Sequence, residues 1–203
     1  MAVPKERLLA VDAALIPPLS ICRLAGEINE TLLAEEPDGF RFDQTHIPHI
    51  TLLQQFIRAS CLPDATRALD QSIGGFRAMA LEIRRSERIS TTAHLVVEPN
   101  ADLRRLHESV VEALAPWAET AGGEEAFLTD GDERPRAADV QWVTHFREQS
   151  SSRHFQPHIT LGVGAAPVLQ EAVSFTADRM ALCHLGRYCT CRGIFWEGRL
   201  RGF

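Results

Sequence analysis

The sequence predicts an α+β fold built on antiparallel sheet, and two features of the chain carry this prediction. Strand patterns follow one another in pairs, and helical patterns fall between these pairs without the regular strand–helix alternation of a parallel sheet. The chain has 203 residues, 45% of them hydrophobic, so it can bury a sizeable core as one large domain or as two small lobes.

The first half of the chain is expected to begin with a strand and a helix. Apolar alternation predicts the strand, and Pro17-Pro18 ends it and opens the helix. Pro37-Asp38-Gly39 has the chemistry of a turn. The expected elements are, in order, a strand over 7–15, a helix over 18–35, a strand over 46–56, a short helix from Pro63 to about 72, and a strand pair over 77–85 and 93–98.

The second half contains the one clearly non-periodic region, residues 122–137. This stretch is rich in Gly, Asp and Glu, and its length predicts a mobile loop or lid. The other expected elements are a helix over 106–120, a helix over 139–151, a strand over 156–163, and strands over 180–185 and 188–196.

Composition narrows the compartment and the partners. No long apolar run is free of charge, and Asp12 interrupts the apolar N-terminal stretch, so we expect neither a membrane span nor a signal peptide but a cytoplasmic protein. Five cysteines without small-scaffold spacing argue against a disulfide framework. A net charge of −6 disfavours long double-stranded nucleic acid and favours a small phosphate ester or an RNA end. We expect a monomer.

The most informative feature is an internal repeat of five residues. Pro48-His49-Ile50-Thr51-Leu52 recurs letter for letter at 157–161. In a chain of this size such a match arises by chance in roughly one case in a hundred. A lone histidine after a proline at a strand start is more often structural than functional, but two copies in the same His-x-Thr context make a functional role the better interpretation.

Strand geometry explains what the repeat can do. Alternate side chains of a strand share one face, so His49 and Thr51 face one side while Ile50 and Leu52 face the other. His158 and Thr160 follow the same pattern. Two imidazoles can supply the base and the acid of phosphodiester chemistry near neutral pH, and threonine hydroxyls can donate to phosphate oxygens. No metal or other cofactor is needed for this set.

These motifs resemble the two-histidine (2H) phosphoesterases, which include 2′-5′ RNA ligase-like proteins and cyclic nucleotide phosphodiesterases. The family signature is two His-x-Thr/Ser-x motifs, and it stands here as His49-Ile-Thr51-Leu and His158-Ile-Thr160-Leu. The resemblance implies a single domain over 1–203 made of two pseudo-symmetric antiparallel lobes with flanking helices around a central cleft. Each lobe would contribute one motif strand, at 49–51 and 158–160. It also implies that His49 and His158 are catalytic and that Thr51 and Thr160 bind phosphate. Which histidine is the acid stays open.

Four other residues are candidates for binding substrate. Phe155 and Phe42 precede the two motifs and could stack on a nucleobase, although core packing is the more common role of such aromatics. Arg58 and Arg153 lie near the motif strands and could contact phosphate or ribose, although solvated surface arginines are more common.

Two metal-like patterns are disfavoured. His46 and His49 form H-x-x-H, but residues three apart on a strand point to opposite faces. The spacing of Cys183, His184, Cys189 and Cys191 does not match the usual zinc pairs, so these cysteines are better explained as small buried hydrophobes.

The sequence therefore predicts a metal-independent phosphodiesterase that acts on 2′,3′-cyclic or 2′-5′-linked nucleotides or on RNA ends. The alternatives are a protein that binds nucleotides or RNA ends in the same cleft without turnover, and a metal-dependent hydrolase that uses His46, His49 and a carboxylate.

Overall fold

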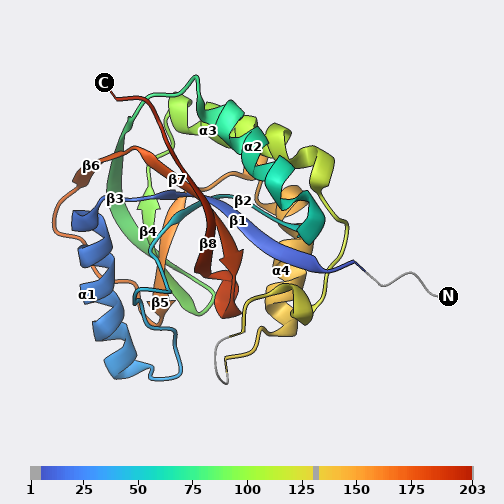
Figure 1. Ribbon diagram of the computed structural model, residues 1–203. Coiled ribbons are helices and arrows are strands. Elements are labelled where there is room, and N and C mark those ends of the chain that lie inside the picture. The colour runs from blue at the N-terminus through green and yellow to red at the C-terminus, as the bar shows by residue number, and fades with distance from the viewer. Residues whose placement is uncertain (1–5, 130–132, 203) are drawn as a thin grey trace.

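The computed structural model describes residues 6–129 and 133–202 and contains two four-stranded antiparallel sheets (Figure 1). The first sheet has the order β2-β1-β7-β8, and the second has the order β5-β4-β3-β6. The strands are β1 (Leu8–Ile16), β2 (Ile50–Arg58), β3 (Met79–Ile89), β4 (Thr92–Val97), β5 (His158–Val163), β6 (Val173–Ala177), β7 (Arg179–Leu185) and β8 (Cys191–Arg199). The α+β architecture predicted from the sequence is confirmed.

Four α-helices cover the sheets, and they cross between the two halves of the chain. They are α1 (Leu19–Glu35), α2 (Leu62–Ile73), α3 (Ala101–Leu114) and α4 (Ala137–Gln149). Helix α1 connects β1 to β2 but packs against β5, whereas α3 and α4 lie between β4 and β5 in sequence but pack against β2 (Figure 1). Each motif strand therefore packs against a helix from the other half of the chain.

Asn29 of α1 fixes this crossed packing. Its side-chain amide donates to the backbone oxygens of Leu161 (2.8 Å) and Phe40 (2.9 Å), and its own oxygen accepts from the amide of Phe42 (3.0 Å). The helix approaches β5 closely at Gly162, which has a φ of +147° and where an added Cβ would lie 3.0 Å from the Asn29 amide nitrogen. Only glycine accommodates both that backbone angle and that approach.

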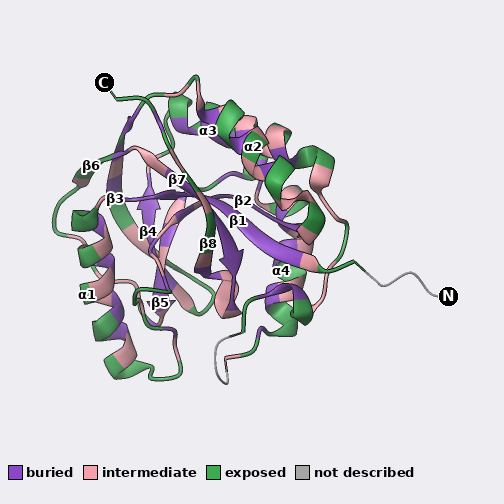
Figure 2. Cartoon of the chain, viewed as in Figure 1, coloured by how far each residue is buried: buried purple, intermediate pink, exposed green. Residues whose placement is uncertain are grey.

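The repeated motif encodes more than the alternation of side chains. Ile50 and Leu52 are fully buried, as are Ile159 and Leu161, and one hydrophobic cluster contains all four. Figure 2 shows β1 and β4, the strands that pair with β2 and β5, mostly in the purple of buried residues. A register shift also falls at the same place in both copies. On β2, Thr51 pairs with Ala14 and Leu53 with Ala13; on β5, Thr160 pairs with His94 and Gly162 with Ala93. The leucine of each repeat is thus the extra residue of a β-bulge.

Several sequence-based boundaries are wrong in informative ways. The expected strand over 46–56 begins only at Ile50, because the preceding residues form an irregular segment in which the Asp43 carboxylate accepts from the amides of Thr45 and His46. The sequence pattern does not predict β6, since VSFTA is short and lacks turn signals of its own. The predicted loop over 122–137 contains a short 3₁₀ turn at Glu124–Ala126 and the start of α4, and its residues 130–132 lie outside the described part. Within residues 6–129 and 133–202, no helix is long and apolar enough to cross a membrane.

Candidate active site

The two motif histidines lie on neighbouring edge strands. His49 directly precedes β2, His158 begins β5, and these strands are the outer members of their sheets and contact each other. The two rings are close enough that a positive charge on His49 lowers the pKa of His158. The structure thus brings together two imidazoles that are more than one hundred residues apart in sequence.

Both imidazoles are oriented by the same local hydrogen bond. Nδ1 of His49 lies 2.8 Å from the backbone oxygen of Ile47, and Nδ1 of His158 lies 2.8 Å from that of Gln156. A carbonyl oxygen can only accept, so Nδ1 carries the proton in each ring, and the lone pair of a neutral ring is on Nε2. The repeat therefore presents two Nε2 atoms in matched fashion. Both rings are partly exposed; the His49 side chain is 11% exposed.

Asp12, which the sequence did not single out, lies beside His49. This carboxylate on β1 is fully buried, and its Oδ2 is 3.5 Å from Nε2 of His49. Oδ2 also accepts from Thr51 Oγ1 and from Gln54 Nε2, each at 2.7 Å. Burial raises the pKa of Asp12, while His49 and the two hydrogen bonds oppose that rise. The sequence pattern does not indicate this contact, because Asp12 lies in an apolar strand pattern that is far from the motif in sequence.

The bulge on β2 allows Thr51 and Gln54 to reach Asp12 together. Thr51 and Gln54 are three residues apart, so they would point to opposite faces of a regular strand. The extra residue, Leu52, restores them to one face, where both reach the same carboxylate oxygen. The hydroxyl proton of Thr51 is therefore engaged with Asp12. Thr160 makes no side-chain hydrogen bond within the described residues.

His94, also absent from the sequence-based candidates, lies beside His158. The two rings stack with centroids 4.4 Å apart and an interplanar angle of 17°. Nε2 of His94 is 2.8 Å from Thr92 Oγ1, whereas its Nδ1 is buried without a partner among the described residues. Burial, with a contribution from the charge of His158, lowers the pKa of His94 to about 3. Burial is also the main reason that the pKa of His158 is lowered, with His49 acting in the same direction.

The two candidate aromatic residues have different environments. Phe155 is buried in the core and stacks on His107, with centroids 4.0 Å apart, so its ring is not available to a nucleobase. Phe42 is partly buried, packs on the core and contacts Phe40 edge-on at 5.3 Å. Core packing, the commoner role of such aromatics, therefore holds for Phe155.

The two candidate arginines lie outside the pair of imidazoles. Arg58 ends β2, at the opposite end of that strand from His49, and pairs with Glu119 at 2.7 Å. Arg58 therefore lies at the far end of the motif strand from the two imidazoles. Arg153 is exposed on a short 3₁₀ turn before β5, and its Nε donates to the imidazole of His154 at 3.0 Å.

The H-x-x-H pair is separated by the fold. His46 is buried beside Arg192, whose guanidinium lies 2.8 Å from the ring Nδ1 and 2.9 Å from Glu133. Burial, helped by Arg192, lowers the pKa of His46. His46 thus packs against Arg192 of β8, and it does not belong to the group of possible metal ligands that contains His49 among the described residues. Cys183 and Cys191 are buried, and all five cysteines are free.

These features place the chain in a known family. A protein-family model described as the 2′-5′ RNA ligase superfamily matches residues 17–185, a span that includes both motifs. The chain belongs to this superfamily, and the resemblance to the two-histidine phosphoesterases is confirmed. A search of curated protein sequences finds no match.

Solved structures with the same fold agree with this assignment. TT0787 of Thermus thermophilus superposes with a TM-score of 0.60 at 16% identity, covering 96% of this chain and 99% of that one. E. coli LigT complexed with phosphate gives a TM-score of 0.53 at 15% identity, covering 97% and 99%. At these identities the likeness shows the fold.

Proposed function

We propose that this chain is a metal-independent phosphodiesterase that acts on 2′,3′-cyclic or 2′-5′-linked nucleotides or on RNA ends, with His49 and His158 as its acid and base. The observation that carries the proposal is the matched pair of Nδ1–carbonyl hydrogen bonds, which leaves two Nε2 atoms on neighbouring edge strands. A phosphodiester held between them would meet one group that removes a proton and another that supplies one.

The two imidazoles have different neighbours, and this difference supports an assignment of the acid and the base. A protonated His49 faces the carboxylate of Asp12, whereas a protonated His158 would face His49 and stack on the neutral ring of His94. We therefore assign His158 as the base that activates water on a cyclic phosphate, and His49 as the acid that protonates the leaving oxygen. In the ligation direction the two roles are exchanged.

The threonines are proposed to bind the non-bridging phosphate oxygens. Thr160 is free to donate within the described residues, whereas a phosphate must compete with Asp12 for the proton of Thr51. The nucleotide class of substrate is supported by the solved structures of E. coli LigT in complex with phosphate, 3′-AMP, ATP and NADP⁺. All four ligands carry a phosphoryl group.

The test is hydrolysis of 2′,3′-cyclic nucleotides and 2′-5′ dinucleotides in excess EDTA. We expect His49→Ala and His158→Ala each to lower the rate by roughly 10²–10⁴-fold. His145→Ala on α4, a histidine whose side chain is 45% exposed, serves as the matched control and should keep the wild-type rate. Full activity in both motif variants would contradict the mechanism. Binding without turnover across the panel would favour the non-catalytic alternative.

A substrate with an activated leaving group separates the acid from the base. A p-nitrophenyl phosphodiester of a nucleoside needs no proton on its leaving oxygen, but its attacking water still needs a base. We therefore expect His49→Ala to recover most of its rate on this substrate and His158→Ala to stay slow. The reverse pattern would exchange the two assignments.

A further inference from the structure

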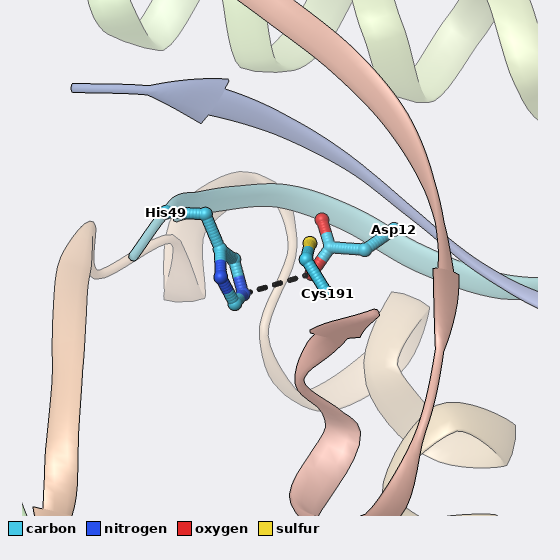
Figure 3. Close-up of side chains that lie close together, drawn as sticks. All are labelled: Asp12, His49 and Cys191. Carbon is cyan, nitrogen blue, oxygen red and sulfur yellow. Dashed lines mark ion pairs between the residues drawn. The ribbon is translucent and has the colours of Figure 1, made fainter. Parts of the chain in front are cut away.

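The side chains of Asp12, His49 and Cys191, which carry three different kinds of donor atom, lie close together beside β1. The ligand atoms of Asp12, His49 and Cys191 all lie within 4.8 Å of one another (Figure 3). Asp12 comes from β1, Cys191 begins β8, and His49 directly precedes β2, so the set exists only in the folded chain. Carboxylate oxygen, imidazole nitrogen and cysteine sulfur are the three donor types that Zn²⁺ uses in proteins.

We propose that Asp12, His49 and Cys191 form a site for a thiophilic divalent cation such as Zn²⁺, and that an ion bound there inhibits the enzyme. The inhibition rests on the function proposed above, because it requires that catalysis use Nε2 of His49. The binding site itself does not rest on it.

His49 is already oriented as a metal ligand. Metal-bound histidines commonly donate their second ring N–H to a carbonyl or carboxylate, which fixes the tautomer and aims the lone pair. The Nδ1–Ile47 hydrogen bond does this here and leaves Nε2 facing Asp12. Since His49 is the partly exposed member of the set, an ion reaches the site from the same side as a substrate.

Asp12 offers an oxygen that lacks a partner. Thr51 and Gln54 hold Oδ2, whereas Oδ1 is buried and accepts no hydrogen bond from the described residues. A buried carboxylate oxygen without a donor is unfavourable, and a cation would satisfy it. The hydrogen bonds to Oδ2 would then hold the ligand in place, as outer partners of metal ligands do.

The spacing is close to that of a tetrahedral ion. With zinc–ligand distances near 2.0–2.3 Å, neighbouring nitrogen and oxygen donors lie roughly 3.4 Å apart, and sulfur lies roughly 3.6 Å from either. The Asp12 carboxylate comes within 3.5 Å of Nε2 of His49 through Oδ2, its hydrogen-bonded oxygen, and the ligand atoms of the three residues lie within 4.8 Å of one another. Shifts of about an ångström in these side chains would bring the three donors to three corners of a tetrahedral zinc ion.

The chemistry of Cys191 selects the ion. An ion that binds the Cys191 sulfur must displace the thiol proton. Zn²⁺, Co²⁺ and Cd²⁺ bind thiolate strongly enough to do so, whereas Mg²⁺ and Ca²⁺ prefer sets made only of oxygen. An ion bound to Nε2 of His49 occupies the lone pair that acid–base catalysis needs, so bound zinc removes activity.

The experiment compares the wild-type protein with Cys191→Ser, because Cys191 has no part in the proposed reaction. Cys191→Ala is the second variant if the buried serine unfolds the chain, and Cys22→Ser on α1 is the control for loss of an unrelated thiol. Co²⁺ is titrated into metal-free protein and the near-ultraviolet thiolate-to-cobalt band is recorded. Hydrolysis of a 2′,3′-cyclic nucleotide is then measured against free Zn²⁺.

We expect one equivalent of Co²⁺ to give the thiolate band in the wild type and in Cys22→Ser, and Zn²⁺ to displace it. Cys191→Ser should lose the band, keep its rate without metal, and need at least about tenfold more Zn²⁺ for half-inhibition. No band, or an equal band in Cys191→Ser, would overturn the site. A band without inhibition, or with a faster rate, would overturn the inhibition. If no substrate is turned over, the proposed function fails and the cobalt titration still decides the site.

Discussion

Replacement of His94 by phenylalanine should flatten the loss of stability of this protein in acid. His94 is 6% exposed, its Nδ1 has no partner among the described residues, and burial holds its pKa at about 3, against 6.5 for a free imidazole. Since the pKa of His94 is lower in the folded chain than in the unfolded chain, His94 is protonated in the unfolded chain but neutral in the native chain at pH values between the two. The free energy of unfolding therefore falls as pH decreases through 6.5 and stops falling below about 3.

The two pKa values fix the size of the effect. Between pH 7 and pH 4.5 the unfolded imidazole becomes almost fully protonated while native His94 stays neutral, which costs about 2.5 kcal/mol of stability. Phenylalanine keeps a flat ring against His158 but cannot take up a proton. The difference in stability between His94→Phe and the wild type should therefore shift by that amount in favour of the variant over this pH range.

Urea denaturation at half-unit pH steps from 7 to 4.5 measures this difference. His145→Gln on α4 controls for the loss of a histidine away from the stack. A difference between His94→Phe and the wild type that stays constant with pH would refute the reasoning. So would an NMR titration in which the His94 ring gains its proton near pH 6.

Two further predictions concern the crossed packing and the candidate arginine. Asn29→Ala removes three hydrogen bonds that connect α1 to β5 and to the segment before the first motif, so it should lower the free energy of unfolding by about 2–4 kcal/mol in urea denaturation. The control Thr31→Ala, on the exposed side of α1, should cost under about 0.5 kcal/mol. Equal losses in the two variants would contradict the role of Asn29. Arg58 forms an exposed ion pair at the far end of β2. Arg58→Ala should therefore leave kcat/KM on a 2′,3′-cyclic nucleotide within about twofold of wild type and cost under about 1 kcal/mol of stability. A tenfold loss of kcat/KM would show that Arg58 reaches the substrate.

The features of this protein that depend on local periodicity can be predicted from its sequence. Two copies of Pro-His-Ile-Thr-Leu predict two strands that bury an isoleucine and a leucine and present a histidine and a threonine, and the structure shows this alternation at both places. Pro17-Pro18 separates the first strand from the first helix as expected, since β1 ends at Ile16 and α1 begins at Leu19, whereas the helix expected over 106–120 spans Ala101–Leu114. The orientation of each imidazole is local as well, since its Nδ1 bonds to the carbonyl two residues earlier.

The difference between the two histidines arises only in the folded chain. Asp12 and His94 lie on the strands that pair with β2 and β5, and nothing in the strand pattern of either residue marks it as part of a site. Their effect comes from burial and from distance across strands, and neither can be read from a linear pattern. Cys191 is brought to His49 in the same way. Identical motifs therefore acquire unequal chemistry, because each lies against a different neighbour: a buried carboxylate beside His49 and a neutral imidazole beside His158.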